Sequence, residues 1–441
     1  MRATNQTSRR GRSRRQFLAQ TAFAGAAALV GARASSSVLN MPVLRAKPRV
    51  KLGKGDPIRI AVIGPGGMGK GHVGAFLNFN KTGRESVHIV ALADCCSVQV
   101  ADAMKMVERD QTSVQCQGYA DYREVLKRDD VHAVLIASPE HWHAQMTIDA
   151  IHAGKDVYCE KPMTLRLPEA LKVREVQNAN PDVLVQIGTQ KMMLPKYNEA
   201  MKLVAAGAIG KPTFSQTSYC RNSKDGEWLY YAIDKRIKPG ETIDWDAWCG
   251  QLGPRPWNHE IYHRWRRYKD FSTGIMGDLL VHEITPLMMA LNVGWPTKVQ
   301  GIGGHYIDKK MENHDQVNLT VQFEKEHTMI VAGSTCNDQG LETMIRGHKA
   351  TMYLGGNNVV IRPQRIYVDE IEEQTVNCPN ISNDQDELRL NWLHCIRTRE
   401  PVKSPVEFAT QVMVIVDLAT RSAWENKTFT FDPETHTTHA A

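Results

Sequence analysis

A glycine-rich turn near residue 64 constrains the fold of this chain more than any other feature. The run 58–63 is short and apolar, and the sequence Gly-Pro-Gly-Gly-Met-Gly follows it directly. In a G-x-G-x-x-G turn between a strand and a helix, the first glycine makes the tight turn, the second admits a pyrophosphate, and the third allows close helix–strand packing. The segment therefore predicts a dinucleotide-binding unit. Its expected cofactor-binding residues are Gly64, Gly66, Gly67, Met68 and Gly69.

Two successive domains follow from the pattern of apolar runs. Through 58–187, short apolar runs alternate with helix-like segments, which is typical of a parallel sheet with helices on both faces. Through 188–430, strand-like runs follow one another and predict a mostly antiparallel open sheet covered on one face by helices. The expected fold class is an α/β Rossmann domain followed by an α+β domain for substrate binding and oligomerisation. A linker at 35–57 and a tail at 431–441 complete this division.

The first 34 residues have the layout of an export signal. Arg14 and Arg15 precede Phe17-Leu18, a weakly apolar run extends over 19–30, and Ala-Arg-Ala at 32–34 provides a small-x-small cleavage site. Paired arginines in this setting indicate the twin-arginine route, which carries folded proteins with any cofactor already bound. The alternative is a disordered basic tail. We therefore expect a periplasmic or otherwise extracytoplasmic protein.

Removal of this signal changes the charge balance of the protein. The whole chain has 54 basic and 48 acidic side chains and a net charge of +6, but residues 1–34 hold seven arginines and no acid. The remainder has 54 − 7 = 47 bases against 48 acids, a net charge of −1. This body gives no electrostatic reason to expect nucleic acid as a partner. No later stretch reaches the roughly 18 apolar residues of a membrane span, so none is expected in the mature chain.

Cysteine usage gives no indication of a metal site or a disulfide framework. The chain has nine cysteines, an odd number, and no CxxC pair; Cys95 and Cys96 are adjacent, and Cys159 lies in an apolar run. Zinc sites and disulfide frameworks need paired cysteines at regular spacings. We therefore expect isolated thiols and no bound metal.

The second predicted strand, 87–93, ends at Asp94. An acid at this position accepts hydrogen bonds from both ribose hydroxyls and repels a 2′-phosphate, which favours NAD over NADP. NADP stays open as the alternative cofactor, and a glycine turn without a ligand stays open as the alternative interpretation of the motif.

Further motifs lie where other predicted strands end. Ser138-Pro-Glu-His-Trp-His143 follows the third run, and Gly154-Lys-Asp-Val-Tyr-Cys-Glu-Lys-Pro162 spans the next. With the glycine turn and the run Gly277-Asp-Leu-Leu-Val-His282, they resemble the Gfo/Idh/MocA family, named after glucose–fructose oxidoreductase and inositol dehydrogenase. The resemblance covers about 58–430. It implies an NAD(P)-dependent oxidoreductase acting on CH–OH groups of carbohydrates or polyols, assembled as a homodimer or homotetramer.

The resemblance assigns roles to individual residues. Lys161 matches the Glu-Lys-Pro lysine, whose ammonium would bond the reacting hydroxyl and stabilise the developing oxyanion. Asp278 and His282 match an Asp-x-x-x-His pair, which would share one helix face, with His282 as general base and Asp278 orienting the site. A surface lysine and a structural histidine are the alternatives. The other expected cofactor contacts are Ser138, His141, His143, Glu160 and again Lys161; Tyr197 and Arg264 are expected to bind substrate beside Lys161, Asp278 and His282.

An aromatic stretch and two departures from the family pattern leave the substrate open. Relatives often carry glycine before the histidine and an acid three residues after it, where this chain has Val281 and Thr285. Residues 221–271 are rich in tryptophan, with Arg264, Arg266 and His263 as polar neighbours. Flat indole faces stack on sugar C–H faces, although a packed insertion or a subunit contact is the alternative. The tryptophans concerned are Trp228, Trp245, Trp248, Trp257 and Trp265.

Three hypotheses about function follow. The first is an exported NAD(P)-dependent oxidoreductase with a tightly bound cofactor that acts on a sugar, polyol or glycoside. The second is a redox-neutral, NAD-dependent glycoside-cleaving enzyme of the same family, whose members often lack the Glu-Lys-Pro lysine present here. The third is a non-catalytic sugar-binding scaffold.

Overall fold

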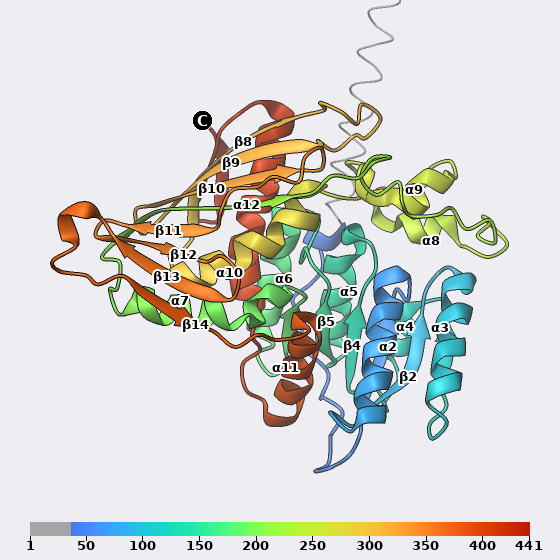
Figure 1. Ribbon diagram of the computed structural model, residues 1–441. Coiled ribbons are helices and arrows are strands. Elements are labelled where there is room, and N and C mark those ends of the chain that lie inside the picture. Colours follow the sequence, from blue (N-terminus) through green and yellow to red (C-terminus); the bar gives the residue numbers. More distant parts are fainter. Residues whose placement is uncertain (1–36) are drawn as a thin grey trace, which may run out of the picture.

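The glycine-rich turn opens a parallel sheet, as the sequence predicts. We describe a computed structural model over residues 37–441; the export signal expected at 1–34 lies outside the described residues. Every strand of the first sheet pairs in parallel, in the order β3-β2-β1-β4-β5-β6 (Figure 1). The strands are β1 (Ile58–Ile63), β2 (Val87–Ala93), β3 (Gln117–Tyr119), β4 (Ala133–Ile136), β5 (Asp156–Cys159) and β6 (Val185–Ile187).

Helices cover both faces of this sheet because the strands are buried on both sides. All four residues of β4 and all four of β5 are buried, which is typical of a central parallel strand. The strand order reverses between β1 and β4, and ligands bind at this switch point in open α/β sheets. The helices of this part are α2 (Gly67–Thr82), α3 (Ser97–Asp110), α4 (Tyr122–Leu126), α5 (Glu140–His152) and α6 (Leu167–Ala179).

The second sheet has ten strands and is antiparallel except for one pair. Its order is β14-β13-β12-β11-β7-β10-β9-β8-β15-β16, and only β10 and β7 run parallel. Alternating burial along β9 shows that one face is packed and the other open. The strands are β7 (Pro212–Cys220), β8 (Pro296–Gly304), β9 (Gln316–Phe323), β10 (His327–Ser334), β11 (Met344–Gly347), β12 (Ala350–Tyr353), β13 (Asn358–Pro363), β14 (Gln374–Asn377), β15 (Phe429–Asp432) and β16 (Thr437–Ala440).

Helices α7 (Pro195–Ala205), α10 (Val281–Leu291) and α12 (Val406–Glu425) cover the packed face of this sheet. They lie between it and the Rossmann part, and one hydrophobic cluster joins the two sheets (Figure 1). The fold class expected from the sequence is therefore confirmed. Among residues 37–441, no helix is long and apolar enough to cross a lipid bilayer.

Two boundaries of the expected domains differ from the structure. Helix α11 (Asp384–Thr398), expected within the second domain, packs Trp392 and Leu393 against the hydrophobic cluster of β1 and α2. The expected tail at 431–441 forms β16 and the end of β15, and pairs at the edge of the large sheet. Both differences arise from long-range pairing, which short polar strands and one amphipathic helix do not reveal locally.

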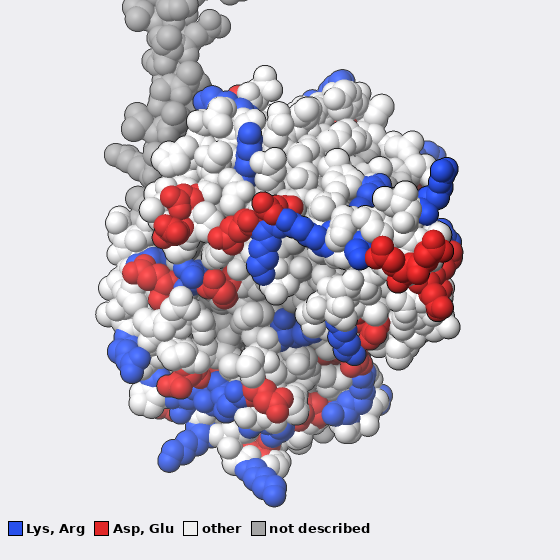
Figure 2. Space-filling model, turned by 90° about the vertical axis from the view of Figure 1, so that its left-hand side faces the viewer, with Lys and Arg blue, Asp and Glu red and all other residues white. Residues whose placement is uncertain are grey.

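Between β7 and α10 the chain forms an irregular excursion. We call residues 221–271 the cover segment; it contains α8 (Trp245–Cys249) and α9 (His259–Arg264). In Figure 1 these two helices lie beyond the labelled ends of α2 and α3, beside the parallel sheet. On the face shown in Figure 2, basic and acidic side chains are interspersed, and neither sign alone covers it.

Candidate active site

The glycine turn forms a cradle that fits a dinucleotide. A Cβ on Gly64 would lie 2.7 Å from the backbone nitrogen of Ser138, and one on Gly69 would lie 2.3 Å from the Gly64 carbonyl oxygen. These glycines let β1 and β4 approach and let α2 pack closely. Gly66 and Gly67 face open space, with no atom within 4 Å of an added Cβ. That space precedes the N-terminus of α2, where backbone N–H groups and the helix dipole favour a pyrophosphate.

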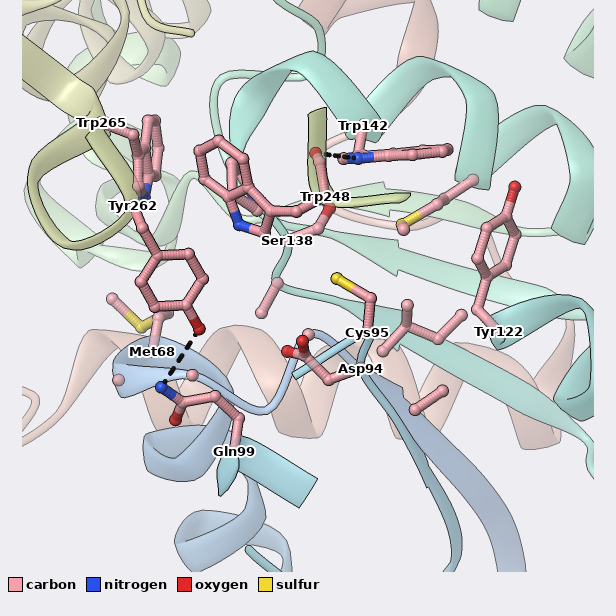
Figure 3. Close-up of a pocket in the computed structure, with 18 of the residues that line it drawn as sticks. Met68, Asp94, Cys95, Gln99, Tyr122, Ser138, Trp142, Trp248, Tyr262 and Trp265 are labelled. Atoms are coloured by element: carbon pink, nitrogen blue, oxygen red, sulfur yellow. Dashed lines mark hydrogen bonds between the residues drawn. The ribbon is translucent and has the colours of Figure 1, made fainter. Parts of the chain in front are cut away.

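A cavity of about 900 Å³ extends from this cradle, and Figure 3 shows part of its lining. Asp94 lies at the end of β2, and its Oδ1 accepts a hydrogen bond from the Cys96 backbone N–H at 2.8 Å. Burial raises the pKa of Asp94 to about 6. The Asp94 carboxylate lines the cavity, where it can accept hydrogen bonds from ribose hydroxyls. The cradle and this carboxylate together fit NAD.

The cover segment docks on both sides of the cavity. At the Asp94 side, the Asp244 backbone N–H donates to the Cys95 carbonyl at 3.0 Å, and that of Ser97 donates to Thr242 at 2.8 Å. At the α5 side, the Trp142 indole donates to the Trp248 carbonyl at 2.9 Å, a bond drawn in Figure 3. Because both ends are anchored, the segment closes the cavity along one side.

Aromatic side chains of the cover segment form most of its own core. Trp245 and Trp248 stack with ring centroids 4.7 Å apart, Trp257 meets Trp245 edge-on, and Trp228 is fully buried. Trp248 and Trp265 line the cavity, and Figure 3 shows the Tyr262 hydroxyl directed at Gln99. Most of the tryptophans therefore pack inside the cover segment, which is the alternative to stacking on a sugar.

Lys161 and Asp278 meet beside this cavity. The Lys161 ammonium donates to Asp278 Oδ1 at 2.9 Å and to the Asp278 carbonyl at 2.8 Å, and each side chain is only 9% exposed. Arg266 Nε donates to the same Oδ1 at 2.8 Å. Burial alone would raise the pKa of Asp278, but the Arg266 and Lys161 cations hold it well below its usual range. The carboxylate is therefore ionised.

Local backbone geometry brings these groups together. Asp278 lies in a π-helical turn, Met276–Leu280, directly before α10; such turns are frequent at functional sites. A Cβ on Gly277 would lie 3.1 Å from the Pro162 ring and 2.1 Å from Thr273 Oγ1. Only glycine lets the loop after β5 approach the turn this closely, and that approach places Lys161 on Asp278.

His282 lies one turn further along, half-buried and near Lys161. Its Nδ1 is enclosed by protein without a hydrogen-bond partner among the described residues. Burial and the adjacent Lys161 ammonium lower the pKa of His282 to about 3, while Asp278 and Glu160 oppose this shift. The imidazole is therefore neutral and able to accept a proton.

Glu160 anchors the loop that carries Lys161. Its Oε1 accepts a hydrogen bond from His72 at 2.9 Å, and His72 Nδ1 in turn accepts one from Arg389 of α11 at 2.8 Å. Burial opposes ionisation, but the His72 hydrogen bond and the Lys161 charge hold the pKa of Glu160 below its usual range. His143 adds a second link, because its ring lies between the Pro162 and Ser138 carbonyls at 2.7 and 2.8 Å.

The structure gathers most of the predicted residues but not all. Six of the expected residues are not among those that line the cavity: Gly69, His141, Tyr197, Arg264, Asp278 and His282. His141 is buried, and its Nε2 bonds the Trp248 carbonyl at 2.9 Å, so it holds the cover segment. Tyr197 lies 2% exposed in the core on α7. Arg264 is engaged by Glu260 and by the Leu229 and Tyr231 carbonyls. The predicted residues that do line it are Gly64, Gly66, Gly67, Met68, Asp94, Ser138, His143, Glu160 and Lys161.

Two charged groups near the site have contacts that sequence reasoning did not assign. Arg266, and not Arg264, reaches Asp278. Glu140 is buried at the start of α5 and accepts hydrogen bonds from Ser272 Oγ at 2.6 Å and from the Thr273 backbone at 3.1 Å. Burial raises its pKa to about 7. Glu140 thus ties the Rossmann part to the segment that leads into the π-helical turn.

Three features together define an NAD-binding oxidoreductase fold. They are the glycine cradle, the acid Asp94 at the end of β2, and the pair formed by Lys161 and Asp278. Residues 58–189 match the model of an oxidoreductase family described by its NAD-binding Rossmann fold, and residues 250–431 match the family's C-terminal alpha/beta domain. The chain belongs to the Gfo/Idh/MocA oxidoreductase family, as the sequence motifs indicate. The two matched ranges leave 190–249 between them, which includes the first part of the cover segment.

Individual relatives include proteins of different named activities. Inositol 2-dehydrogenase 3 of Saccharopolyspora erythraea is 30% identical over 191 residues, 43% of this chain and 53% of that protein. An alpha-N-acetylgalactosaminidase of Shewanella oneidensis is 26% identical over 249 residues, 51% of each chain. The chain thus spans about half the length of these curated relatives.

Solved structures share the fold over almost their whole length. A levoglucosan dehydrogenase in complex with NADH and levoglucosan matches with a TM-score of 0.64 at 17% identity, over 85% of this chain and 99% of that one. An NAD binding oxidoreductase from Klebsiella pneumoniae matches with a TM-score of 0.64 at 19% identity, over 85% and 98%. At these identities the likeness is one of fold.

Proposed function

We propose that this protein is an NAD-dependent oxidoreductase that moves hydride between a hydroxyl-bearing carbon of a sugar, polyol or glycoside and a tightly held cofactor. The observation that carries the proposal is the contact of Lys161 with Asp278 near the neutral His282, beside a cavity built for a dinucleotide. The names of the inositol and levoglucosan dehydrogenases support the substrate class.

Lys161 and His282 have different roles at the substrate hydroxyl. A lysine ammonium has three N–H donors, and two of those of Lys161 go to Asp278. The third donates to the substrate oxygen and stabilises the negative charge that develops there. His282, whose imidazole is neutral, takes the hydroxyl proton as general base, and the charges of Asp278 and Glu160 offset part of the lowering of its pKa by burial and by Lys161. Bound nicotinamide dinucleotide supplies the hydride acceptor.

We propose further that the dinucleotide is retained between turnovers. The cover segment is bonded to the β2–α3 loop on one side and to α5 on the other, so exchange of a nucleotide requires these contacts to open. A retained cofactor suits an exported protein, because little free dinucleotide is present outside the cytoplasm. The paired arginines Arg14 and Arg15 support export by the twin-arginine route, and the open sheet face with Ile302, 63% exposed, supports a homodimer or homotetramer.

Purified mature protein tests the main proposal. After removal of small molecules, its absorbance spectrum is recorded before and after addition of sugars and polyols without added NAD. We expect bound dinucleotide that becomes reduced, and we expect Lys161→Met to keep the dinucleotide but lose the change. Protein that binds NAD and sugars but never reduces the nucleotide would instead be a sugar-binding scaffold.

One relative favours a second candidate, a redox-neutral glycoside-cleaving enzyme. The similarity to an alpha-N-acetylgalactosaminidase supports it. Transient transfer of hydride from a ring carbinol carbon to the bound dinucleotide would give a ketone that acidifies a neighbouring C–H. Loss of that proton would expel the aglycone as an alcohol, water would add to the resulting double bond at the anomeric carbon, and the hydride would return to the ketone. Release of p-nitrophenol from nitrophenyl glycosides, without lasting accumulation of reduced nucleotide, distinguishes this activity from net oxidation.

A further inference from the structure

The Arg266 guanidinium has donors that the proposed chemistry does not use. Its Nε bonds Asp278, but neither Nη donates to another described residue. A guanidinium carries five N–H donors in a planar fork, so the four on its Nη atoms are free. The side chain is 20% exposed and lines the cavity, and its Nη atoms are not among the buried atoms that lack a partner. The free donors therefore face the cavity.

The plane of this guanidinium is held in place. Asp278 fixes its Nε end, the Trp265 ring lies 4.2 Å from its central carbon, and the Tyr231 ring lies 5.7 Å from it. An arginine held by a carboxylate and two aromatic rings loses little further freedom when it binds a ligand. The arrangement is thus preorganised for a planar, bidentate acceptor.

The charges of the protein around the fork are balanced. Lys161 and Arg266 provide two positive charges, and Asp278 and Glu160 provide two negative ones. The nearby Asp234 is paired with Arg236 at 2.7 Å, and the Glu140 carboxyl is occupied by Ser272 and the backbone of Thr273. An oxidised nicotinamide ring adds one positive charge to this balanced set, which favours an anionic group on the fork.

We propose that Arg266 binds a carboxylate of the substrate, so that the enzyme acts on acidic sugars such as hexuronates or aldonates. Lys161 and Arg266 bond the same oxygen of Asp278, so a molecule of one sugar unit reaches both: its hydroxyl on Lys161 and its carboxylate on the fork. Bidentate arginine–carboxylate pairs are among the strongest hydrogen-bonded contacts. This inference rests on the proposed function for its account of turnover, but the anion subsite is measurable by binding alone.

The test compares matched acidic and neutral ligands on the purified holoprotein. Dissociation constants are measured by calorimetry for D-glucuronate and D-glucose, D-galacturonate and D-galactose, and D-gluconate and D-glucitol. We expect at least one acid to bind about tenfold or more tightly than its neutral partner. Arg266→Gln abolishes that preference, whereas Arg266→Lys retains part of it, because it keeps the charge but loses the fork. Arg255→Gln, in the same segment but paired with the exposed Asp270, keeps the wild-type preference.

The outcomes separate this inference from the proposed function. If no acid is preferred, or if the preference survives Arg266→Gln, the inference is wrong, and reduction of bound nucleotide by neutral sugars still supports the oxidoreductase. If an acid binds through Arg266 but no bound nucleotide is ever reduced, the subsite holds and the proposed oxidoreductase fails. A third outcome is that the Arg266→Gln protein loses its dinucleotide but, once dinucleotide is added back, binds the acidic sugar with unchanged affinity. In that case Arg266 binds a phosphate of the cofactor and the inference is wrong.

Discussion

The proposed retention of the dinucleotide by the cover segment leads to a specific prediction at Gly250. This residue has φ +53°, and a Cβ placed on it would lie 2.3 Å from Cζ2 of the Trp142 ring. Trp142 holds the segment through its hydrogen bond to the Trp248 carbonyl. We expect Gly250→Ala to push the segment away from α5 and to speed release of the bound dinucleotide.

The size of the effect follows from a matched glycine. Gly253 also has positive φ, +78°, but no atom lies within 4 Å of an added Cβ. Gly253→Ala therefore carries backbone strain alone, about 1–3 kcal/mol. Gly250→Ala adds a clash that moves the half-buried Trp142 indole, and overpacking of this kind costs about 1–3 kcal/mol more. Because opening relieves the clash, dinucleotide release should be about 5- to 150-fold faster than from Gly253→Ala.

The assay measures loss of bound dinucleotide over time. Purified protein is diluted into excess enzyme that consumes free NAD, and the nucleotide that remains bound is quantified. Circular dichroism and thermal melts check that both variants are folded. Equal release rates for Gly250→Ala and Gly253→Ala would refute the reasoning that the contact between the cover segment and α5 retains the cofactor.

Three further predictions concern single side chains. In titrations of the protein stripped of cofactor, Asp94→Asn should lower the affinity for NAD about tenfold and reduce the preference of the protein for NAD over NADP. The NAD affinity of the wild type should fall below pH 6, where Asp94 gains a proton, and the NAD affinity of the variant should not. Lys161→Met should lower kcat by at least about 100-fold in steady-state assays while the bound dinucleotide stays. Glu140→Gln removes a buried carboxyl group whose pKa is raised from 4.5 to about 7. In the wild type, the protonated carboxyl of Glu140 stabilises the fold below pH 4.5, and this stabilisation is lost as pH rises through 7. Relative to wild type, the variant's free energy of unfolding in urea should rise by up to about 3 kcal/mol between pH 4.5 and pH 8; a constant difference would contradict the raised pKa.

The sequence predicts those parts of the site that belong to short, continuous sequence motifs. The glycine turn, Asp94 and Lys161 each sit at the end of one strand, and the order of those strands brings them to one edge of the sheet. Asp278 was found through a family motif, but its direct contacts with Lys161 and Arg266 were not, because they depend on the π-helical turn and on how Gly277 packs.

Longer-range contacts explain what sequence reasoning missed. The cover segment pairs Ile243 with Cys96 far earlier in the chain, and no local pattern indicates that register. Arg264 ends α9, whereas Arg266 lies in the 3₁₀ turn Trp265–Arg267 that follows, so neighbouring arginines point to different partners. His141 and His143 are two apart on α5 and occupy different faces, and only His143 lines the cavity.

The central claim is that a retained nicotinamide dinucleotide takes hydride from a hydroxyl-bearing carbon held by Lys161 and His282. In the most direct measurement, the purified protein is incubated without added NAD with sugars, inositol and uronates that carry deuterium on carbon. The protein is then denatured, and the mass of the released dinucleotide is determined by mass spectrometry. We predict reduced dinucleotide that contains deuterium, and none from Lys161→Met. Protein that holds no dinucleotide and binds none, or bound dinucleotide that never gains deuterium from any member of the panel, would contradict the account.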